Sequence, residues 1–287
     1  MALLEVRHLT KRYQSFVLDD VSFSLEPGYI MGFIGRNGAG KTTTLKSIMN
    51  LVRPDSGTVS VLGREFRADE LALKQDIGFM LGGFAYYPRT RVSRLTDTYR
   101  RFYDRWEEKA YRVYLAQFDL DDTKTVEQLS SGMKVKYALA LALSHGARLL
   151  MLDEPTSGLD PVSRDEVLDL FRAIIEDGTR SILFSTQITS DLDKCADFVT
   201  YIAKGRLVAS DEKDDFLGAY RIVKGTKSEF TDDIRTALVG YKQTDLGFTG
   251  LMRVDTIPAG TSLAVEPADI EDIMIYHERV DRPMLER

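Results

Sequence analysis

The chain has a single cysteine among its 287 residues, and it has no long apolar run. One cysteine, Cys195, excludes an intrachain disulfide, and its neighbours Leu192 and Ala196 favour a packing role in a helix. No stretch approaches the roughly 20 apolar residues that span a bilayer, and the first seven residues lack the apolar core of a signal peptide. No internal repeat or low-complexity segment is present. A net charge of −6 argues against broad nucleic-acid binding.

The composition is that of a globular protein, with 44% hydrophobic and 29% charged residues. A chain of this length buries a substantial core, as one large domain or as one large domain with a small one.

A glycine-rich run, Gly-Arg-Asn-Gly-Ala-Gly-Lys-Thr-Thr, occupies positions 35–43 and matches the phosphate-loop pattern at every required position. It follows an apolar strand at 29–34 and precedes a helix that should cover 43–50. Glycines allow consecutive backbone N–H groups to converge on phosphates, while Lys41 supplies a charge and Thr42 a hydroxyl ligand for Mg²⁺. The run predicts a nucleoside triphosphate site, with contacts from Gly35, Asn37, Gly38, Ala39, Gly40, Lys41, Thr42 and Thr43.

A second motif is the apolar strand at 149–152 that ends in Asp153 and Glu154. Ligands in open α/β sheets lie at the carboxyl ends of strands, so both carboxylates should emerge beside the phosphate loop. Asp153 is suited to hold Mg²⁺. Glu154 is suited to orient or deprotonate the attacking water.

Two further motifs flank this strand: Leu-Ser-Ser-Gly-Met-Lys at 129–134 and Pro-Thr-Ser-Gly-Leu-Asp at 155–160. Alone, a Ser-Ser-Gly turn is most often an ordinary helix cap. In this order and spacing, from about Leu3 to Leu207, the motifs resemble those of the ATPase subunits of ABC transporters, most closely bacterial exporter ATPases of the YtrB type. The resemblance implies a P-loop NTPase ABC cassette, of class α/β, with a RecA-like core, an N-terminal antiparallel β subdomain and an α-helical subdomain.

The resemblance also implies that two cassettes meet head to tail, as homodimer or heterodimer. Each ATP would lie between one chain's phosphate loop and the other chain's signature, with contacts from Ser130, Ser131, Gly132 and Asp160. Tyr13 stands where the family keeps a ring that stacks on adenine. Packing within a sheet is the alternative role for Tyr13.

The sequence departs from the family pattern at two places. Gln187 replaces a histidine that contacts the γ-phosphate, and glutamine cannot become cationic. We hypothesise slow or absent turnover, or a trap for an ATP-bound state. Gly82 and Gly83 stand where many members carry a glutamine that touches magnesium and the water, so this loop is expected to be mobile.

The remaining patterns outline the domains. Residues 1–30 alternate as antiparallel strands do, residues from about 84 to 145 are helical, and strands and helices alternate from 146 to about 210. We expect an ABC ATPase domain at 1–215 and a small α+β accessory region at 216–287, with a strand at 251–257 and a helix at 267–279 that carries His277. Regulation, dimerisation and the docking of partners are the alternative roles for this region. Four aromatic residues recur at helical spacings: Tyr99, Phe102, Tyr103 and Trp106. They either pack in the core or, together with residues 84–88, form a groove for a membrane subunit.

The expected function is therefore that of an ATPase, with ATP and Mg²⁺ as ligands, that drives export through separate membrane subunits. Its expected location is the cytoplasm, on the inner face of the membrane, and nucleic acid is not among the expected partners. A non-transport ABC ATPase that moves a soluble protein or nucleic-acid partner is the main alternative, because a fold does not determine a function. A phosphate-loop kinase is a weaker one, since the signature has no role there.

Overall fold

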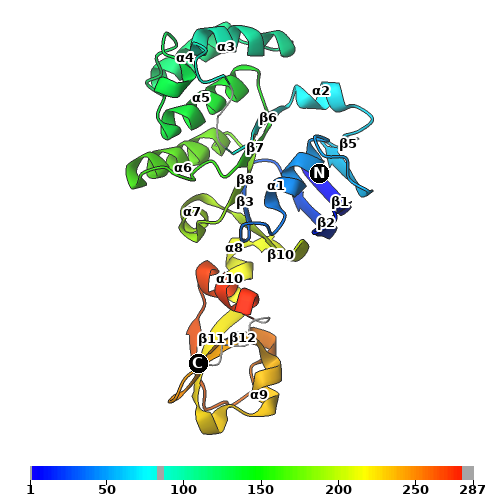
Figure 1. Cartoon of the computed structure of the whole chain (residues 1–287), viewed down its shortest axis with the longest axis vertical. Helices are drawn as coiled ribbons and strands as arrows, with labels where there is room; N and C mark the ends of the chain where they lie inside the picture. Colours follow the sequence, from blue (N-terminus) through cyan, green and yellow to red (C-terminus); the bar gives the residue numbers. More distant parts are fainter. Residues whose placement is uncertain (1, 83–86, 280–287) are drawn as a thin grey trace. The chain divides into compact units, whose positions relative to one another are not determined.

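A computed structural model of the chain describes residues 2–82 and 87–279. The chain divides into two compact units, Met1–Ser210 and Asp211–Arg287 (Figure 1). Of the loop expected to replace the family's glutamine, Gly82 is described, whereas Gly83 and the neighbouring residues 84–86 lie outside the described ranges.

An antiparallel sheet opens the first unit, as the alternating pattern predicted. Leu4 of its first strand pairs with Leu25 and Val61, so apolar side chains on neighbouring strands share one face. The strand order is β2-β1-β4-β5, with bounds β1 Leu4–Arg12, β2 Val17–Leu25, β4 Ser56–Val61 and β5 Arg64–Glu65.

A second sheet of six strands forms the centre of the first unit, in the order β10-β9-β3-β8-β7-β6. The pairs formed by β3 with β8 and β9, and by β7 with β6 and β8, are parallel, so these strands end at the same edge. The bounds are β3 Ile30–Ile34, β6 Ile77–Met80, β7 Leu149–Asp153, β8 Ser181–Thr186, β9 Phe198–Ala203 and β10 Arg206–Glu212.

Successive residues of the central strands enter two different cores. In β7, Leu150 and Leu152 pack with the helical residues of one core, while Leu149 and Met151 pack with β1, β2 and α1 in the other. Burial on both faces explains why these strands are apolar throughout. Few polar side chains of this sheet are buried, and three of them, Asp153, Ser185 and Thr186, stand at the carboxyl ends of β7 and β8.

Seven α-helices and two short 3₁₀ helices are described in the first unit. No helix in the described ranges has the length and apolarity to cross a membrane. The bounds are α1 Lys41–Ile48, α2 Glu70–Lys74, α3 Val92–Tyr99, η1 Arg100–Phe102, α4 Glu108–Gln117, η2 Val126–Gln128, α5 Ser131–Ser144, α6 Pro161–Ile175 and α7 Thr189–Cys195.

Of the four aromatic residues expected on one helical face, three stay together and Phe102 separates from them. The α-helix ends at Tyr99, and the side chain of Phe102 in the following 3₁₀ turn is 71% exposed. Tyr103 instead stacks on Tyr99 and on His145, with ring centroids 4.7 Å and 3.7 Å apart. Burial lowers the pKa of His145 to about 4, so this ring is neutral at pH 7. Tyr99 and Trp106 pack against the core, whereas Phe102 lies at the surface.

The second unit is a four-stranded antiparallel sheet with helices, and two of its elements have other bounds than expected. The strand predicted at 251–257 is β13, Gly247–Arg253, and a 3₁₀ turn, η4 Val254–Thr256, follows it. The helix predicted from 267 begins at Ile270, because Pro267 still pairs with Arg221. The remaining bounds are α8 Lys213–Gly218, β11 Tyr220–Thr226, η3 Lys227–Glu229, α9 Asp232–Ala237, β12 Leu238–Gln243, β14 Ala264–Pro267 and α10 Ile270–Arg279.

A glycine sets the contact between β12 and α10 in this unit. A Cβ atom at Gly240 would lie 2.1 Å from the backbone oxygen of Tyr276, so Gly240→Ala must push the helix away. We expect a loss of about 1–3 kcal/mol in the local free energy of unfolding, measured by amide hydrogen exchange in β12 and α10. Gly218→Ala is the matched control, since no described atom lies within 4 Å of its Cβ position. Equal protection in both variants would contradict the prediction.

Candidate functional site at the ends of the central strands

The glycine-rich loop connects β3 to α1, and its glycines allow close approach to residues of other strands and turns. Gly40, just before α1, has a φ of 117°, and a Cβ there would lie 3.0 Å from the ring of Phe16. A Cβ at Gly35 would lie 2.3 Å from the carbonyl oxygen of Ile202. No described side chain caps α1, so the N–H groups of its first turn remain available to an anion.

A cavity of about 600 Å³ opens beside this loop. It is bounded by the turn between β1 and β2, by the loop and α1, and by residues that follow β7 and β8. Its lining residues are Ser15, Phe16, Arg36, Asn37, Gly38, Gly40, Lys41, Thr42, Thr43, Glu154, Ser157 and Gln187.

Lys41 and Glu154 meet inside this cavity. Lys41 is 5% exposed, and its Nζ donates to the carbonyl oxygen of Gly35 at 2.6 Å and lies 3.1 Å from Glu154 Oε1. Glu154 Oε2 is buried and has no hydrogen-bond partner among the described residues. Glu154 also has a φ of 51°, in the left-handed region that is uncommon for residues other than glycine. This conformation and the two hydrogen bonds from Glu154 N to Ser185 hold the carboxylate at the strand end.

Asp153 lies between two hydroxyl groups. Thr42 Oγ1 donates to Asp153 Oδ2 at 2.8 Å, and Ser185 Oγ donates to Oδ1 at 2.6 Å. Thr42 and Asp153 thus bring two hard oxygen donors together, which is the partial ligand set that Mg²⁺ uses beside phosphate oxygens. Within the described ranges, no group of three or more His, Cys, Asp or Glu side chains could hold a metal ion. The donors fit a metal that arrives with a phosphate ligand.

Gly82 belongs to one of the two departures from the family pattern, and it lies against these carboxylates. Its Cβ position would be 3.3 Å from the backbone oxygen of Asp153 and 4.0 Å from Glu154 Cβ. Gln187, the other departure, lines the cavity at the end of β8. Gly82 thus lies beside the two carboxylates, and Gln187 lies on the wall of the cavity.

The signature residues stay outside the cavity of their own chain. Ser130 caps α5 by accepting from Met133 N at 3.2 Å, and both Ser130 and Ser131 are exposed. Gly132 packs against Ser163, whose backbone N donates to Asp160. Hydrogen bonds from Ser163 hold the pKa of Asp160 below its usual range. Asp160 thus caps α6, and it does not line the cavity with the phosphate loop.

Tyr13 lies at the edge of the site. Its side chain is 44% exposed, and its ring centroid is 6.4 Å from that of Phe16, which does line the cavity. The structure places Phe16 between Tyr13 and the glycine loop, since the Cβ position of Gly40 is in contact with Phe16.

Sequence reasoning missed several residues of the site. Phe16, Ser15, Arg36 and Ser157 line the cavity, and Ser185 binds Asp153 from the neighbouring strand. The signal for Ser185 was the polar end of an otherwise apolar strand. The parallel register of β7 and β8 sets Ser185 opposite Asp153.

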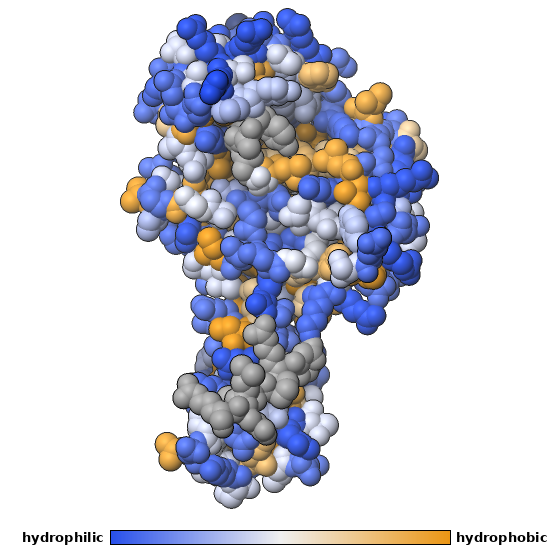
Figure 2. Space-filling view, viewed as in Figure 1, coloured by the Kyte–Doolittle hydropathy of each residue, from blue (hydrophilic) through white to orange (hydrophobic). Residues whose placement is uncertain are grey.

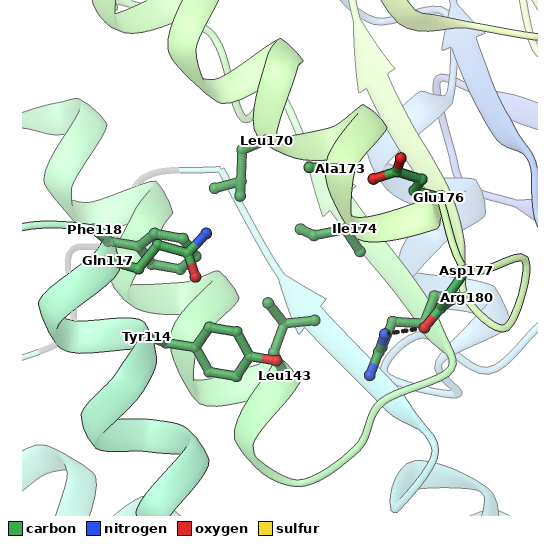
Figure 3. Close-up of a pocket in the computed structure, with 10 residues that line it drawn as sticks. All are labelled: Tyr114, Gln117, Phe118, Leu143, Leu170, Ala173, Ile174, Glu176, Asp177 and Arg180. Carbon is green, nitrogen blue, oxygen red and sulfur yellow. Dashed lines mark hydrogen bonds and ion pairs between the residues drawn. The ribbon is translucent and has the colours of Figure 1, made fainter.

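A second cavity of about 410 Å³ lies between α4, α5 and α6 (Figure 3). Tyr114 and Phe118 lie at one end of it, and Asp177 and Arg180 form an ion pair at the other. Its lining combines apolar side chains with Gln117, Glu176 and the Asp177–Arg180 pair, and among the described residues it includes neither a glycine-rich loop nor a lysine. The cavity beside the glycine loop is therefore the better candidate for a phosphate site.

Comparison with known proteins agrees with this geometry. Residues 18–157 match the family model described as ABC transporter. The ABC transporter ATP-binding protein YtrB of Bacillus subtilis is 31% identical over 219 residues, which cover 76% of this chain and 75% of that protein. The daunorubicin resistance ATP-binding protein DrrA3 of Streptomyces coeruleorubidus is 35% identical, over 71% of this chain and 66% of that protein.

The fold has close counterparts among solved structures. The structure of an ATP-binding subunit of an ABC transporter superposes with a TM-score of 0.67, at 27% sequence identity, and covers 74% of this chain and 91% of that one. From the site geometry, the matched family model and these relatives, we conclude that the chain belongs to the ATP-binding proteins of ABC transporters, a family whose members hydrolyse ATP.

Proposed function

We propose that the cavity binds ATP with Mg²⁺ and that the chain hydrolyses it as the ATP-binding subunit of an exporter. One observation carries the proposal, namely that the phosphate loop meets both carboxylates of β7. Thr42 Oγ1 lies 2.8 Å from Asp153, and Lys41 Nζ lies 3.1 Å from Glu154. Charge for phosphates, metal ligands and a proton acceptor are thus gathered at one point.

The triphosphate is expected to lie along the loop, where backbone N–H groups and the first turn of α1 face an anion. The Lys41 ammonium, now bonded to the oxygen of Gly35, would turn to the β- and γ-phosphates. Tyr13 would stack on the adenine, with Phe16 beside it. The exposed ring of Tyr13 leaves it free to do so.

Thr42 and Asp153 would hold Mg²⁺ through the hydroxyl and carboxylate oxygens that now face each other. When bound, the metal supplies positive charge that offsets the charge on the phosphate oxygens. Ser185 keeps Asp153 turned toward Thr42 through its own hydrogen bond.

Glu154 is the proposed base. In the reaction the water oxygen bonds to the γ-phosphorus, the bond from that phosphorus to the β-phosphate oxygen breaks, and the water proton passes to the Glu154 carboxylate. ADP and inorganic phosphate are the products. Glu154 Oε2 is buried and lacks a hydrogen-bond partner among the described residues, so it is able to accept that proton.

A second ABC ATPase chain would complete the site. Ser130, Ser131 and Gly132 do not line the cavity of their own chain, although Ser130 begins a 14-residue helix whose N-terminus favours an anion. Head-to-tail dimerisation would bring these residues onto the γ-phosphate of the partner. The placement of Asp160 at the neighbouring helix start supports the same interface.

Membrane subunits are the proposed partners, which would place the chain in the cytoplasm, on the inner face of the membrane. Three exposed apolar side chains of the first unit support this: Leu71 at 84%, Phe102 at 71% and Tyr87 at 69% exposure. Figure 2 shows apolar side chains gathered beside β6 and α2. Drug-resistance names among the relatives support export as the direction.

Binding and co-purification test this function. The full chain should bind a fluorescent ATP analogue with Mg²⁺, form dimers on ATP in light scattering, and co-purify with an integral membrane protein. Failure to bind ATP would contradict the site. Binding and hydrolysis with only a soluble partner would retain the ATPase and contradict the transport role.

Gln187→His should raise the rate of ATP hydrolysis about tenfold. A charge-assisted hydrogen bond from histidine to the γ-phosphate is roughly twice as strong as one from the neutral glutamine amide. If the two bonds differ by about 1.4 kcal/mol in the transition state, the rate differs about tenfold. Steady-state hydrolysis by both proteins, with Mg²⁺, measures the change. The gain should shrink as the pH rises above about 7, because the imidazole loses its proton.

Gln187→Ala is the control, and it should fall below the parent protein because it has no hydrogen-bonding group. Equal turnover in the parent protein and Gln187→His would show that Gln187 does not limit hydrolysis.

A further inference from the structure

A buried carboxylate, Asp191 in α7, lies behind the cavity and does not reach it. It is completely buried, and its Oδ2 accepts hydrogen bonds from Thr156 Oγ1 at 2.6 Å and from Thr186 Oγ1 at 3.4 Å. Both threonines are completely buried as well. Hydrogen bonds to a charged group are worth more than neutral ones, and water does not compete for these.

The two threonines adjoin residues that lie on different walls of the cavity. Thr156 directly precedes Ser157, and Thr186 directly precedes Gln187; Ser157 and Gln187 both line the cavity. Thr186 Oγ1 also accepts from Ile188 N at 2.9 Å. The backbone is therefore held on both sides of Gln187, and a single carboxylate links the loop after β7 to the loop after β8.

An arginine supplies the counter-charge. Arg164 Nε lies 3.9 Å from Asp191 Oδ1, and its own backbone N donates to the oxygen of Asp160 at 3.0 Å. Burial raises the pKa of Asp191, while the bond from Thr156 and the charge of Arg164 oppose that rise. Burying a carboxylate is costly unless it is paired and hydrogen-bonded, so packing alone gives little reason for an acid at this position.

We propose that Asp191 is a positioning residue for ATP hydrolysis, which sets the distance between Ser157 and Gln187 through Thr156 and Thr186. The inference rests on the proposed function of the cavity. Asp191 touches neither substrate nor reacting atoms. It acts through the two loops that do, and errors of about 1 Å in such loops cost up to about 100-fold in rate.

The alternative is that Asp191 only attaches α7 to the rest of the unit. A purely structural role lowers the melting temperature without changing kcat in the protein that remains folded. A positioning role lowers kcat in folded protein while KM for ATP changes little, because the phosphate loop that binds ATP is untouched.

Three variants separate these roles. Thr156→Val keeps the shape of the side chain and removes the hydroxyl that donates to Asp191, Thr156→Ser keeps that hydroxyl, and Asp191→Asn removes the charge. Asp165→Asn is the control, since Asp165 is an exposed carboxylate of α6 that pairs with Lys194 of α7. Single-turnover hydrolysis with the full chain in excess gives the rate, a fluorescent ATP analogue gives the affinity, and circular dichroism gives the folded fraction.

We expect Thr156→Val and Asp191→Asn each to lower the hydrolysis rate about 10- to 100-fold, with ATP affinity within about threefold of the parent. Thr156→Ser should recover most of the rate. The double variant should lose little more than either single one, because both changes break the same contact.

Two results would overturn the inference. If the parent protein binds and hydrolyses ATP, and folded Thr156→Val and Asp191→Asn hydrolyse at the parent rate, Asp191 is structural. If Asp191→Asn does not fold, Thr156→Val decides alone. If the parent protein itself does not bind ATP, the proposed function fails first, and the inference fails with it.

Discussion

Glu154→Gln is expected to lower the rate of ATP hydrolysis by about 10²- to 10⁴-fold, the usual contribution of a positioned general base. Glutamine keeps the length and shape of the side chain, and the backbone bonds from residue 154 to Ser185 do not depend on the carboxylate. The amide cannot accept the water proton. Steady-state and single-turnover release of phosphate, at saturating ATP and Mg²⁺, measures the loss.

The same variant should still bind ATP and should hold the ATP-bound dimer for longer, since the step that ends that state is slowed. Light scattering in the presence of ATP reports the dimer. Glu176→Gln, an exposed carboxylate beyond α6, is the matched control and should hydrolyse at the parent rate. A fast Glu154→Gln variant would mean that another group takes the proton.

Lys41→Ala is expected to weaken ATP binding by about 10- to 100-fold, because hydrogen bonds to charged groups contribute about 1.5–3 kcal/mol. The variant also leaves Glu154 without its cation at 3.1 Å, in a site where Lys41 is 5% exposed. An unpaired carboxylate facing phosphates adds repulsion. Titration with a fluorescent ATP analogue measures the dissociation constant.

Lys46→Ala tests whether the loss comes from the position of the charge. Lys46 lies in the last turn of the same helix and does not line the cavity. The Lys46→Ala variant should bind ATP as tightly as the parent protein does. An equal loss in both variants would show that only the net charge of α1 matters, and it would remove the assigned role of Lys41.

The sequence was strongest where a function needs consecutive residues. Phosphate binding requires glycines, a lysine and a hydroxyl within nine positions, so Gly35 to Thr43 predicted the loop and the helix that follows it. The same holds for Asp153 and Glu154 at the end of an apolar strand. The α/β class followed as well, because strands buried on both faces are apolar throughout.

Periodicity was weaker where the chain changes direction. Spacings of three and four residues put Tyr99, Phe102, Tyr103 and Trp106 on one face, yet the α-helix ends at Tyr99. Tyr103 then turns inward to stack on His145, and Phe102 remains at the surface. A spacing pattern describes a face only while the helix continues.

The sequence by itself determined the family, the phosphate loop and the two carboxylates, because each is a local pattern whose chemistry depends on neighbours in the chain. Only the tertiary structure decided which distant groups support them. Ser185 reaches Asp153 through the register of two parallel strands, Phe16 reaches the cavity from the turn between β1 and β2, and Asp191 joins two loops 30 residues apart. Such partners are brought together by packing, which no local pattern records.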